Sequence, residues 1–431
     1  MSIPPWFQLP EHVKDRLNKV AIIGGGIAGN TLAYHLNCSG VEVTLFEKKE
    51  ALAKGASGNP AAIFEPKLMR GGTVLGQYLA SSYLYALKFY EDLEKETGES
   101  IWHHRGGTLN LIADEKDLKR HQSFQDNTEL PRDHYFIADP VQASDLAGVS
   151  LSQSAMWYPK GGCINTSTLA RALTKNINIK LVNEISSIEE LSQNLNSNWR
   201  LHFSDGSEPL DFDACIMANA FSIRKFGQSK FLPVVMNRGQ VSTHSQVGIS
   251  KNLKCVVSGA GYLTPLIDGK HVFGATFERL RSFEEADDSS LTDDRHEHNL
   301  SFLREYLPFF EKEFSLSELK GRTSVRGTTV DRLPLVGPLH RHADYVDNYG
   351  LLKNGAKHRK WEEASYYKGL YVAAGFGSRG FVTAPFMARY LTALITGDEI
   401  PVSDTVMQGV HPARFVIRDL KRGIETTLVD A

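Results

Sequence analysis

The chain has 431 residues, of which 42% are hydrophobic and 23% are charged, and its formal net charge is -2 at pH 7. This length suffices for two or three domains, and the composition is ordinary for a globular protein. The near-neutral charge argues against the uniformly basic surface of a general nucleic-acid binder, although it is compatible with a local basic patch.

The cysteine pattern and the N-terminus exclude several classes of protein. Four scattered cysteines without C-x-x-C spacing predict no metal site and no disulfide framework, so we expect reduced thiols in a cytoplasmic protein. The first 18 residues carry prolines and charges where a signal peptide needs an apolar run. No run of about 18 apolar residues occurs, so we expect no membrane-spanning helix.

The N-terminal part of the chain predicts a β-α-β unit after a tail or linker over residues 1–18. KVAIIGG (19–25) is typical of a short buried strand that ends at glycines. IAGNTLAYHLNCSG (27–40) has helical spacing, and VEVTLFE (41–47) predicts a second strand. Such a unit implies parallel strands joined by a right-handed crossover.

The next part of the chain mixes helical and strand patterns. Residues 75–97 predict a long amphipathic helix, and a strand-like segment follows at 106–113. Residues 114–160 are polar, and we expect an irregular stretch there. Another helix is predicted over 165–176, with its N-cap at Asn165 or Thr166.

The remainder predicts mostly strands and one late helix. A hairpin is expected over 199–220, with Asp205-Gly206 at its turn. Residues 231–280 alternate like antiparallel strands, and a helix is expected near 297–313. The segment 369–397 predicts a strand, a glycine turn and the last core helix.

Glycine-rich strand-turn-helix units therefore lie near both ends of the chain, with antiparallel-looking sequence between them. This pattern predicts an α/β fold, in which a discontinuous Rossmann-like cofactor-binding domain carries an inserted antiparallel-sheet domain. We expect the cofactor-binding domain to comprise 19–74, 160–230 and 325–431. The substrate domain would then comprise 75–159 and 231–324.

The first glycine loop predicts a dinucleotide site. Gly24, Gly26 and Gly29 form a G-x-G-x-x-G pattern between strand and helix. These glycines allow a tight turn, close approach of a pyrophosphate and close helix packing. Glu47, at the end of the second strand, would accept a ribose hydroxyl, which disfavours NADP. The alternative is a glycine turn that only packs a helix.

Two more small-residue loops favour FAD over NAD. In GASGNPAAIFEPKL (55–68), Ser57 and Asn59 have side chains suited to phosphate or ribose, and the segment 61–63 would let the backbone lie flat against a large ring. GFGSRG (375–380) offers a further backbone cradle ahead of a helix, whose N-terminus would stabilise negative charge on a reduced flavin. The alternatives are a surface loop and an ordinary strand-helix turn.

Seven segments together carry a resemblance to a known family: VAIIGGGIAG (20–29), GASGNPAA (55–62), NRGQVS (237–242), GYLTPLIDGKHVFGATFE (261–278), TSVRGTTVDRLPLVG (323–337), LYVAAGFGSRGFVTAPF (370–386) and HPARFVIRDLKRG (411–423). The chain resembles the D-amino-acid oxidase and glycine oxidase superfamily of FAD-dependent amine oxidases. Within it, the chain is most similar to the FAD domain of the MnmC family of tRNA wobble-uridine modification proteins. The likeness covers nearly the whole chain.

The resemblance implies an FAD site at the interface of the two domains, with Ile185 near the adenine and residues 61–63 near the isoalloxazine. The implied cofactor-binding residues are Gly24, Gly26, Ile27, Ala28, Gly29, Glu47, Lys48, Ala56, Ser57, Asn59, Ala61, Ala62, Ile63, Ile185, Ala218, Asn219, Gly377, Ser378, Arg379 and Gly380.

The resemblance also implies a substrate-binding residue. Arg326 matches the superfamily arginine that pairs with a substrate carboxylate, a role that suits the planar guanidinium fork. The alternative for Arg326 is a structural salt bridge with Asp331 or another neighbour. Lys67 and Arg379 are expected to bind substrate at the mouth of the site, and the alternative for Lys67 is a simple pair with Glu65.

The family implies oxidation of an N-substituted glycine. The implied reaction removes the carboxymethyl group of 5-carboxymethylaminomethyl(-2-thio)uridine at the tRNA wobble position, giving 5-aminomethyl(-2-thio)uridine and glyoxylate, with dioxygen as electron acceptor. One alternative is an FAD-dependent oxidase of free glycine, sarcosine or D-amino acids. Another is a flavin-bound tRNA-binding protein without turnover.

A tRNA partner needs a phosphate-binding surface, and two basic clusters are candidates. The first comprises Lys353, Lys357, Arg359 and Lys360, and the second comprises Arg414, Arg418, Lys421 and Arg422. Each could equally be a solvated face, and Arg70 could line the mouth beside Lys67. Bifunctional members of the family carry a methyltransferase domain ahead of the FAD domain. We expect none here, so methylation of the product would need a separate protein.

Overall fold

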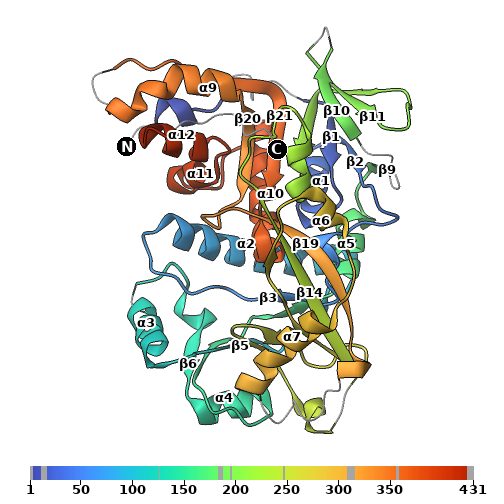
Figure 1. Cartoon of the computed structure of the whole chain (residues 1–431), viewed down its shortest axis with the longest axis vertical. Helices are drawn as coiled ribbons and strands as arrows, with labels where there is room; N and C mark the ends of the chain where they lie inside the picture. Colours follow the sequence, from blue (N-terminus) through green and yellow to red (C-terminus); the bar gives the residue numbers. More distant parts are fainter. Residues whose placement is uncertain are drawn as a thin grey trace.

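The computed structural model describes residues 3–10, 17–125, 127–182, 188–194, 197–245, 248–307, 316–355 and 359–424. Two large sheets organise the molecule, one in the upper half and one in the lower half of Figure 1. Long helix α2 (Val74–Thr97) runs between them.

The upper sheet has six strands in the order β20-β21-β13-β1-β2-β9. Their bounds are β1 Lys19–Ile23, β2 Glu42–Phe46, β9 Ile179–Val182, β13 Ala214–Met217, β20 Leu335–His340 and β21 Tyr366–Ala374. All neighbours pair in parallel except β20 and β21, which are antiparallel. The predicted β-α-β unit is confirmed, because β1 and β2 are parallel and α1 (Ile27–Cys38) connects them.

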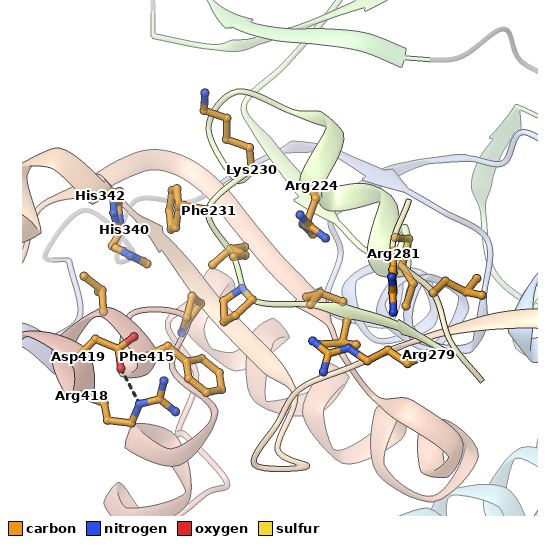
Figure 2. Close-up of a pocket in the computed structure, with 18 residues that line it drawn as sticks. Arg224, Lys230, Phe231, Arg279, Arg281, His340, His342, Phe415, Arg418 and Asp419 are labelled. Atoms are coloured by element: carbon orange, nitrogen blue, oxygen red, sulfur yellow. Dashed lines mark hydrogen bonds and ion pairs between the residues drawn. The ribbon is translucent and has the colours of Figure 1, made fainter. Parts of the chain in front are cut away.

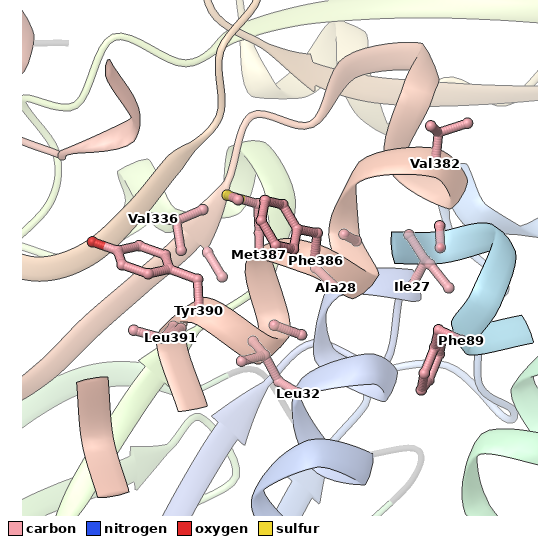
Figure 3. Close-up of a cluster of buried hydrophobic side chains, with 14 of the residues drawn as sticks. Ile27, Ala28, Leu32, Phe89, Val336, Val382, Phe386, Met387, Tyr390 and Leu391 are labelled. Carbon is pink, nitrogen blue, oxygen red and sulfur yellow. The ribbon is translucent and has the colours of Figure 1, made fainter. Parts of the chain in front are cut away.

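One face of this sheet is covered by helices α1, α2, α5 (Thr166–Lys175) and α10 (Gly380–Thr396). Figure 3 shows the cluster of buried side chains between α1, α2 and α10, which includes Leu32, Met387 and Leu391. Full burial of such a side chain stabilises the fold by about 1.5–3 kcal/mol. Helix α2, which the sequence assigns to the substrate domain, shares this core. The domain boundaries stay a prediction.

The lower sheet has nine strands, and its neighbours are antiparallel except for the parallel pair β15 and β5. The bounds are β5 Thr108–Leu111, β6 Phe136–Ala138, β7 Ala155–Tyr158, β14 Val235–Ser245, β15 Val256–Ser258, β16 Tyr262–Leu263, β17 Lys270–Gly274, β18 Glu278–Arg279 and β19 Lys320–Thr328. The alternation expected over residues 231–280 is thus confirmed.

Two three-stranded sheets complete the strands. β3 (Ala62–Phe64), β8 (Gly162–Ile164) and β4 (Trp102–His104) pair in that order. The other sheet contains β10 (Ile188–Gln193), β11 (Trp199–Phe203) and β12 (Leu210–Phe212). β11 and β12 form the expected hairpin, and Gly206 in its turn has a φ of 74°.

Two expectations about secondary structure are wrong. Residues 114–160 are not irregular, because they contain helices α3 (Glu115–Gln125) and α4 (Pro140–Ala147) as well as β6 and β7. Helix α3 buries only His121, so it lacks the apolar periodicity by which a helix is found. Helix α7 (Asp293–Tyr306) begins before 297, at the N-cap Thr292.

The N-cap predicted at Asn165 is confirmed, since its side chain accepts the Thr168 N–H. The remaining helices are α6 (Phe283–Asp287), α9 (His342–Tyr349), α11 (Asp404–Val410) and α12 (Arg414–Lys421).

Part of the expected tail is docked on the molecule. Trp6 and Phe7, in the short 3₁₀ helix Pro5–Phe7, are buried in a cluster with Tyr345 and residues of α12. The Trp6 carbonyl accepts the Tyr345 hydroxyl at 2.9 Å. Among the residues that the structure describes, no helix is long and apolar enough to cross a bilayer.

Candidate cofactor and substrate site

The glycine loop after β1 is packed so tightly that its first and third glycines cannot be replaced without movement. Gly24 has a φ of 108°, and a Cβ there would lie 2.8 Å from the Ala218 carbonyl oxygen. A Cβ on Gly29 would lie 1.9 Å from the Gly24 carbonyl oxygen. Both glycines therefore serve the close packing of α1 against the ends of β1 and β13.

Gly26 has open space in front of it instead. It is the N-cap of α1 in an extended conformation, with no side chain capping the helix. The nearest atom to a Cβ built there is the Ser57 Oγ, at 3.4 Å. The first N–H groups of α1 therefore face a space that suits a pyrophosphate, toward which the helix dipole is favourable.

Ser57 lies at this helix N-terminus. Its Oγ accepts the Ile27 N–H at 2.9 Å, and the side chain is buried. A hydroxyl that accepts one hydrogen bond can still donate its own hydrogen, so Ser57 is suited to a phosphate oxygen. Ala56 precedes Ser57 in the 3₁₀ helix Ala56–Gly58, and Ala28 lies in the first turn of α1.

Glu47 connects the end of β2 to the same loop. Its carboxylate accepts the Gly25 N–H at 2.8 Å and the Lys49 N–H at 3.0 Å. A carboxylate has about four acceptor positions, so a ribose hydroxyl can still donate to it. Lys48 is exposed. This placement agrees with the role predicted for Glu47.

The end of β13 forms the other wall of the glycine loop. Ala218 is buried, and its carbonyl oxygen lies over Gly24. The Asn219 Oδ1 is buried and lacks a hydrogen-bond partner among the described residues. An orphaned buried acceptor is costly, and a donor on a bound molecule would satisfy it.

The second small-residue loop is held by both sheets. Arg322 of β19 donates to the Lys54 carbonyl at 2.6 Å and to the Gly55 carbonyl at 2.5 Å. Asn59 donates to the Tyr262 hydroxyl at 3.1 Å, and its carbonyl accepts the Thr166 hydroxyl. The loop is thus a fixed wall of the site, and the interpretation as a simple surface loop is wrong.

The segment after this loop continues the wall as strand β3. Ala61 and Ala62 are buried, and Ile63 is half-buried. Ala62, Ile63 and Phe64 pair with β8. The small side chains leave room for a flat ring to lie against this backbone.

The third loop brings a second helix N-terminus to the site. Residues Gly377–Arg379 form a 3₁₀ turn that leads into α10 at Gly380. A Cβ on Gly380 would lie 3.2 Å from the Ile27 Cγ2, so the first turns of α1 and α10 are in contact. Phe376 bridges Thr328 of β19, which places Ser378 and its neighbours beside the lower sheet.

Arg326 lies on β19 where this strand meets the cofactor loops. Its guanidinium covers Gly239 of β14, since a Cβ on Gly239 would lie 2.5 Å from Nη2. Its one printed hydrogen bond is a long one, 3.5 Å from Nη1 to the Thr276 carbonyl. Burial lowers the pKa of Arg326, and the nearby Tyr262 opposes that shift.

The alternative interpretation of Arg326 as a salt bridge with Asp331 is wrong. Asp331 instead forms a two-pronged ion pair with Arg414, at 2.8 and 2.9 Å. Among the described residues, Arg326 forms no ion pair with any carboxylate. A desolvated guanidinium without a counter-ion is suited to an incoming carboxylate.

Tyr262 and Arg322 are site residues that the sequence did not single out. Burial raises the pKa of Tyr262, so its phenol stays protonated and can donate a hydrogen bond. Arg322 and Arg326 are four residues apart on β19, so strand alternation places both on one face. This spacing was a usable signal for Arg322. Tyr262 offered none, because it reaches the site through sheet pairing.

The mouth of the site carries several cations. Arg379 donates to the Glu65 carbonyl at 3.2 Å and pairs with its carboxylate at 3.6 Å. Lys67 is exposed, and its pKa is lowered by desolvation and by the charges of Arg379 and Arg332. Glu65 therefore forms its ion pair with Arg379 rather than with Lys67.

Some predicted residues lie elsewhere. Ile185 and Lys357 are outside the described residues. Lys353, Arg359 and Lys360 are exposed, and Arg359 lies over the Trp361 ring. Arg414 is buried and fully engaged, so its prediction as an RNA-contacting residue is wrong. Its length let it reach Asp331 from the next helix, which a sequence pattern does not show.

Comparisons with known proteins agree with this geometry. Residues 19–394 match the family DAO, FAD dependent oxidoreductase. The chain is 32% identical over 422 residues to the tRNA 5-methylaminomethyl-2-thiouridine biosynthesis bifunctional protein MnmC of Chromobacterium violaceum, covering 97% of this chain and 62% of that protein. It is 33% identical over 418 residues to the protein of the same name from Methylobacillus flagellatus, covering 96% of this chain and 62% of that protein. The chain therefore spans under two thirds of the length of these relatives.

Solved structures share the fold. Glycine oxidase from Geobacillus kaustophilus has a TM-score of 0.69 at 20% identity, covering 90% of this chain and 97% of that chain. Iminodiacetate oxidase from Chelativorans sp. BNC1 has a TM-score of 0.67 at 20% identity, covering 89% of this chain and 97% of that chain. The predicted glycine oxidase-like α/β fold is confirmed.

Proposed function

Because the chain belongs to the FAD dependent oxidoreductase family, with FAD as its cofactor, we propose that it oxidises an N-carboxymethyl group on a tRNA wobble uridine. The substrate is 5-carboxymethylaminomethyl(-2-thio)uridine, and the products are 5-aminomethyl(-2-thio)uridine and glyoxylate. The observation that carries the proposal is Arg326, a desolvated guanidinium without a carboxylate partner beside the cofactor loops. The similarity to MnmC proteins supports the tRNA substrate.

The residues that would hold FAD are those of the three loops. Gly26 and Ser57 face the pyrophosphate space, Glu47 is suited to the ribose, and Ala61 to Ile63 suit the ring. The adjacent N-termini of α1 and α10 present N–H groups to negative charge. The orphaned Asn219 Oδ1 would receive a donor.

The chain's own residues position the substrate. Arg326 binds the carboxylate, and Tyr262 can donate a hydrogen bond to the same group while Asn59 holds its hydroxyl in place. When bound, FAD accepts a hydride from the substrate Cα. Loss of that hydride and of the amine proton leaves a C=N bond, which water cleaves to the aminomethyl group and glyoxylate. No strong protein base is needed in this scheme.

The substrate proposal is tested on tRNA isolated from cells that accumulate the carboxymethylaminomethyl nucleoside. We expect the purified flavoprotein to convert this nucleoside into aminomethyluridine, with one glyoxylate released per conversion, as measured by mass spectrometry of the wobble nucleosides. Tyr262→Phe, which keeps the ring and removes the hydroxyl, should slow the conversion while the FAD spectrum is unchanged.

The second enzymatic function is oxidation of free glycine, sarcosine or a D-amino acid, because Arg326 would bind their carboxylates equally well. Fast peroxide release from such an amine, with the wobble nucleoside unchanged, would show that this second function is the right one. Binding of tRNA without bleaching of the flavin by any N-substituted glycine would indicate a non-catalytic protein.

The relatives' name gives a methylated nucleoside as end product. We therefore propose that a methyltransferase acts on the aminomethyl product, as a separate partner in the cytoplasm, where both would meet tRNA. Co-incubation with a methyl donor and such an enzyme should convert the product to methylaminomethyluridine.

A further inference from the structure

A large cavity lies away from the cofactor loops. Its volume is about 800 Å³, and it opens between the loop after the 3₁₀ helix Ala220–Lys225, strand β18, the end of β20 and helix α12 (Figure 2). None of the residues predicted to bind cofactor or substrate lines it.

The lining of this cavity is strongly cationic. Five cations line it: Arg224, Lys230, Arg279, Arg281 and Arg418. The single acidic lining residue, Asp419, is paired with Arg418 at 2.8 Å. Within the described part of the chain, the side chains of the other four cations form no ion pair. Like charges held this close repel one another, so their grouping favours a bound anion.

Aromatic rings lie between these cations. Phe231 stacks on His342 with centroids 4.4 Å apart, and its edge meets His340 at 4.9 Å. Phe415 lies under the Arg418 guanidinium at 4.8 Å. Figure 2 shows Arg224, Arg279 and Arg281 at one end of the cavity, and Phe415 with Arg418 at the other.

His340 is a second sign that a ligand binds here. It is 1% exposed, it lines the cavity, and neither ring nitrogen has a hydrogen-bond partner among the described residues. A buried polar ring without partners is costly, and a polar group of a ligand that enters the cavity would relieve that cost.

We propose that this cavity binds a phosphate-bearing segment of RNA, with phosphates at the free arginines and a base on the aromatic surface. Arginine forks match phosphate oxygens, and unpaired bases stack on aromatic rings and on guanidinium planes. An acidic peptide would use the charges but not the rings. The inference rests on the proposed function only in naming tRNA as the RNA that supplies the segment.

The cavity is connected to the mouth of the catalytic site by a short path. Arg332 lies near enough to Lys67 to lower its pKa, and the adjacent Asp331 holds Arg414 at the start of α12. One turn later, Arg418 lines the cavity. An RNA whose wobble base enters the mouth can therefore extend over this loop to the cavity.

The test measures fluorescence anisotropy of a labelled anticodon stem-loop RNA with the FAD-loaded protein at several salt concentrations. The variant Arg279→Gln/Arg281→Gln removes two exposed cavity charges, and Lys251→Gln/Lys270→Gln removes two exposed charges elsewhere. We expect the cavity variant to bind roughly tenfold or more weakly at about 0.1 M salt, with the slope of log K against log salt reduced by about one. The control should match the wild type.

Equal affinity and equal salt slope in wild type and cavity variant, with the FAD spectrum of both intact, would overturn the proposal. So would displacement of the RNA by a polyglutamate peptide at matched charge concentration, because it would indicate a protein partner. If the wobble nucleoside is converted while the cavity variant binds normally, the cavity proposal fails and the proposed function stands. If the cavity variant loses RNA binding and the wild type leaves the nucleoside unchanged, the proposed function fails and the cavity proposal stands.

Discussion

Two buried arginines show how differently the two ends of β19 and its following loop are used. Arg414 donates to both oxygens of Asp331, to the Pro334 carbonyl at 3.0 Å and to the Leu333 carbonyl at 2.6 Å. Arg326 has one long bond to a carbonyl and no counter-ion among the described residues. Burial lowers the pKa of both.

The difference separates a structural group from a ligand-binding group. A guanidinium whose donors are all used by the protein fixes the position of α12 and has nothing left for a ligand. A guanidinium that is desolvated and unpaired carries a cost that a bound carboxylate removes. The same distinction applies to the glycines: Gly29 is closed in by protein atoms, whereas Gly26 faces open space.

The largest expected effect is on the cofactor. Gly26→Val should fold, because Gly26 has an extended conformation that other residues adopt and its Cβ would meet only Ser57. We expect loss of essentially all bound FAD, since the side chain would fill the pyrophosphate space. Flavin absorbance after desalting measures this. Gly29→Val is the contrast, and we expect it to fail at folding; a yellow Gly26→Val protein with full flavin content would contradict the site.

The second effect concerns the saturated arginine. Arg414→Ala should lower the free energy of unfolding by about 3–5 kcal/mol, because Asp331 and two carbonyls lose their partner. Denaturant unfolding followed by tryptophan fluorescence measures it. Folded protein should keep its FAD, and Arg414→Lys should lose less. A loss below about 1 kcal/mol would mean that the clamp is not structural.

The third effect concerns the unpaired arginine. Arg326→Ala should raise KM for the carboxylated substrate roughly 30-fold or more, since losing one side of a desolvated charge pair costs about 2 kcal/mol or more. Steady-state glyoxylate release measures this. FAD content and the denaturation midpoint should not fall, because no protein partner is lost. An unchanged KM would remove Arg326 from the substrate site.

The smallest effect is acid sensitivity beside the Arg414 clamp. Burial lowers the pKa of His411 to about 3, with the Arg414 charge as a second cause. The unfolded imidazole titrates near 6.5, so the folded state binds fewer protons below that pH. Stability is therefore complete above about pH 6.5 and falls as the pH drops toward 3, by about 1.4 kcal/mol per pH unit.

This acid sensitivity has a matched variant. His411 accepts the Ala413 N–H at Nδ1 and contacts the Tyr366 hydroxyl at Nε2. We expect His411→Asn to show a shallower decline of the denaturation midpoint between pH 6 and pH 5 than the wild type. Parallel pH profiles of the two proteins would show that His411 does not contribute.

Short-range patterns predicted much of the fold. The β-α-β unit, the cap at Asn165 and the turn at Gly206 each depend on residues close together in sequence. Helix α3 was missed because its surface is polar all round, and helical periodicity is visible only when one face is apolar.

The sequence by itself determined the cofactor loops, because a backbone that must approach a phosphate or another backbone requires glycine at fixed spacing. Only the tertiary structure decided which charges are used up. It paired Asp331 with Arg414, left Arg326 free, placed Tyr262 beside it and gathered the cavity cations from three separate segments. Ion pairing depends on distances of a few ångströms between residues far apart in sequence, which no local pattern encodes.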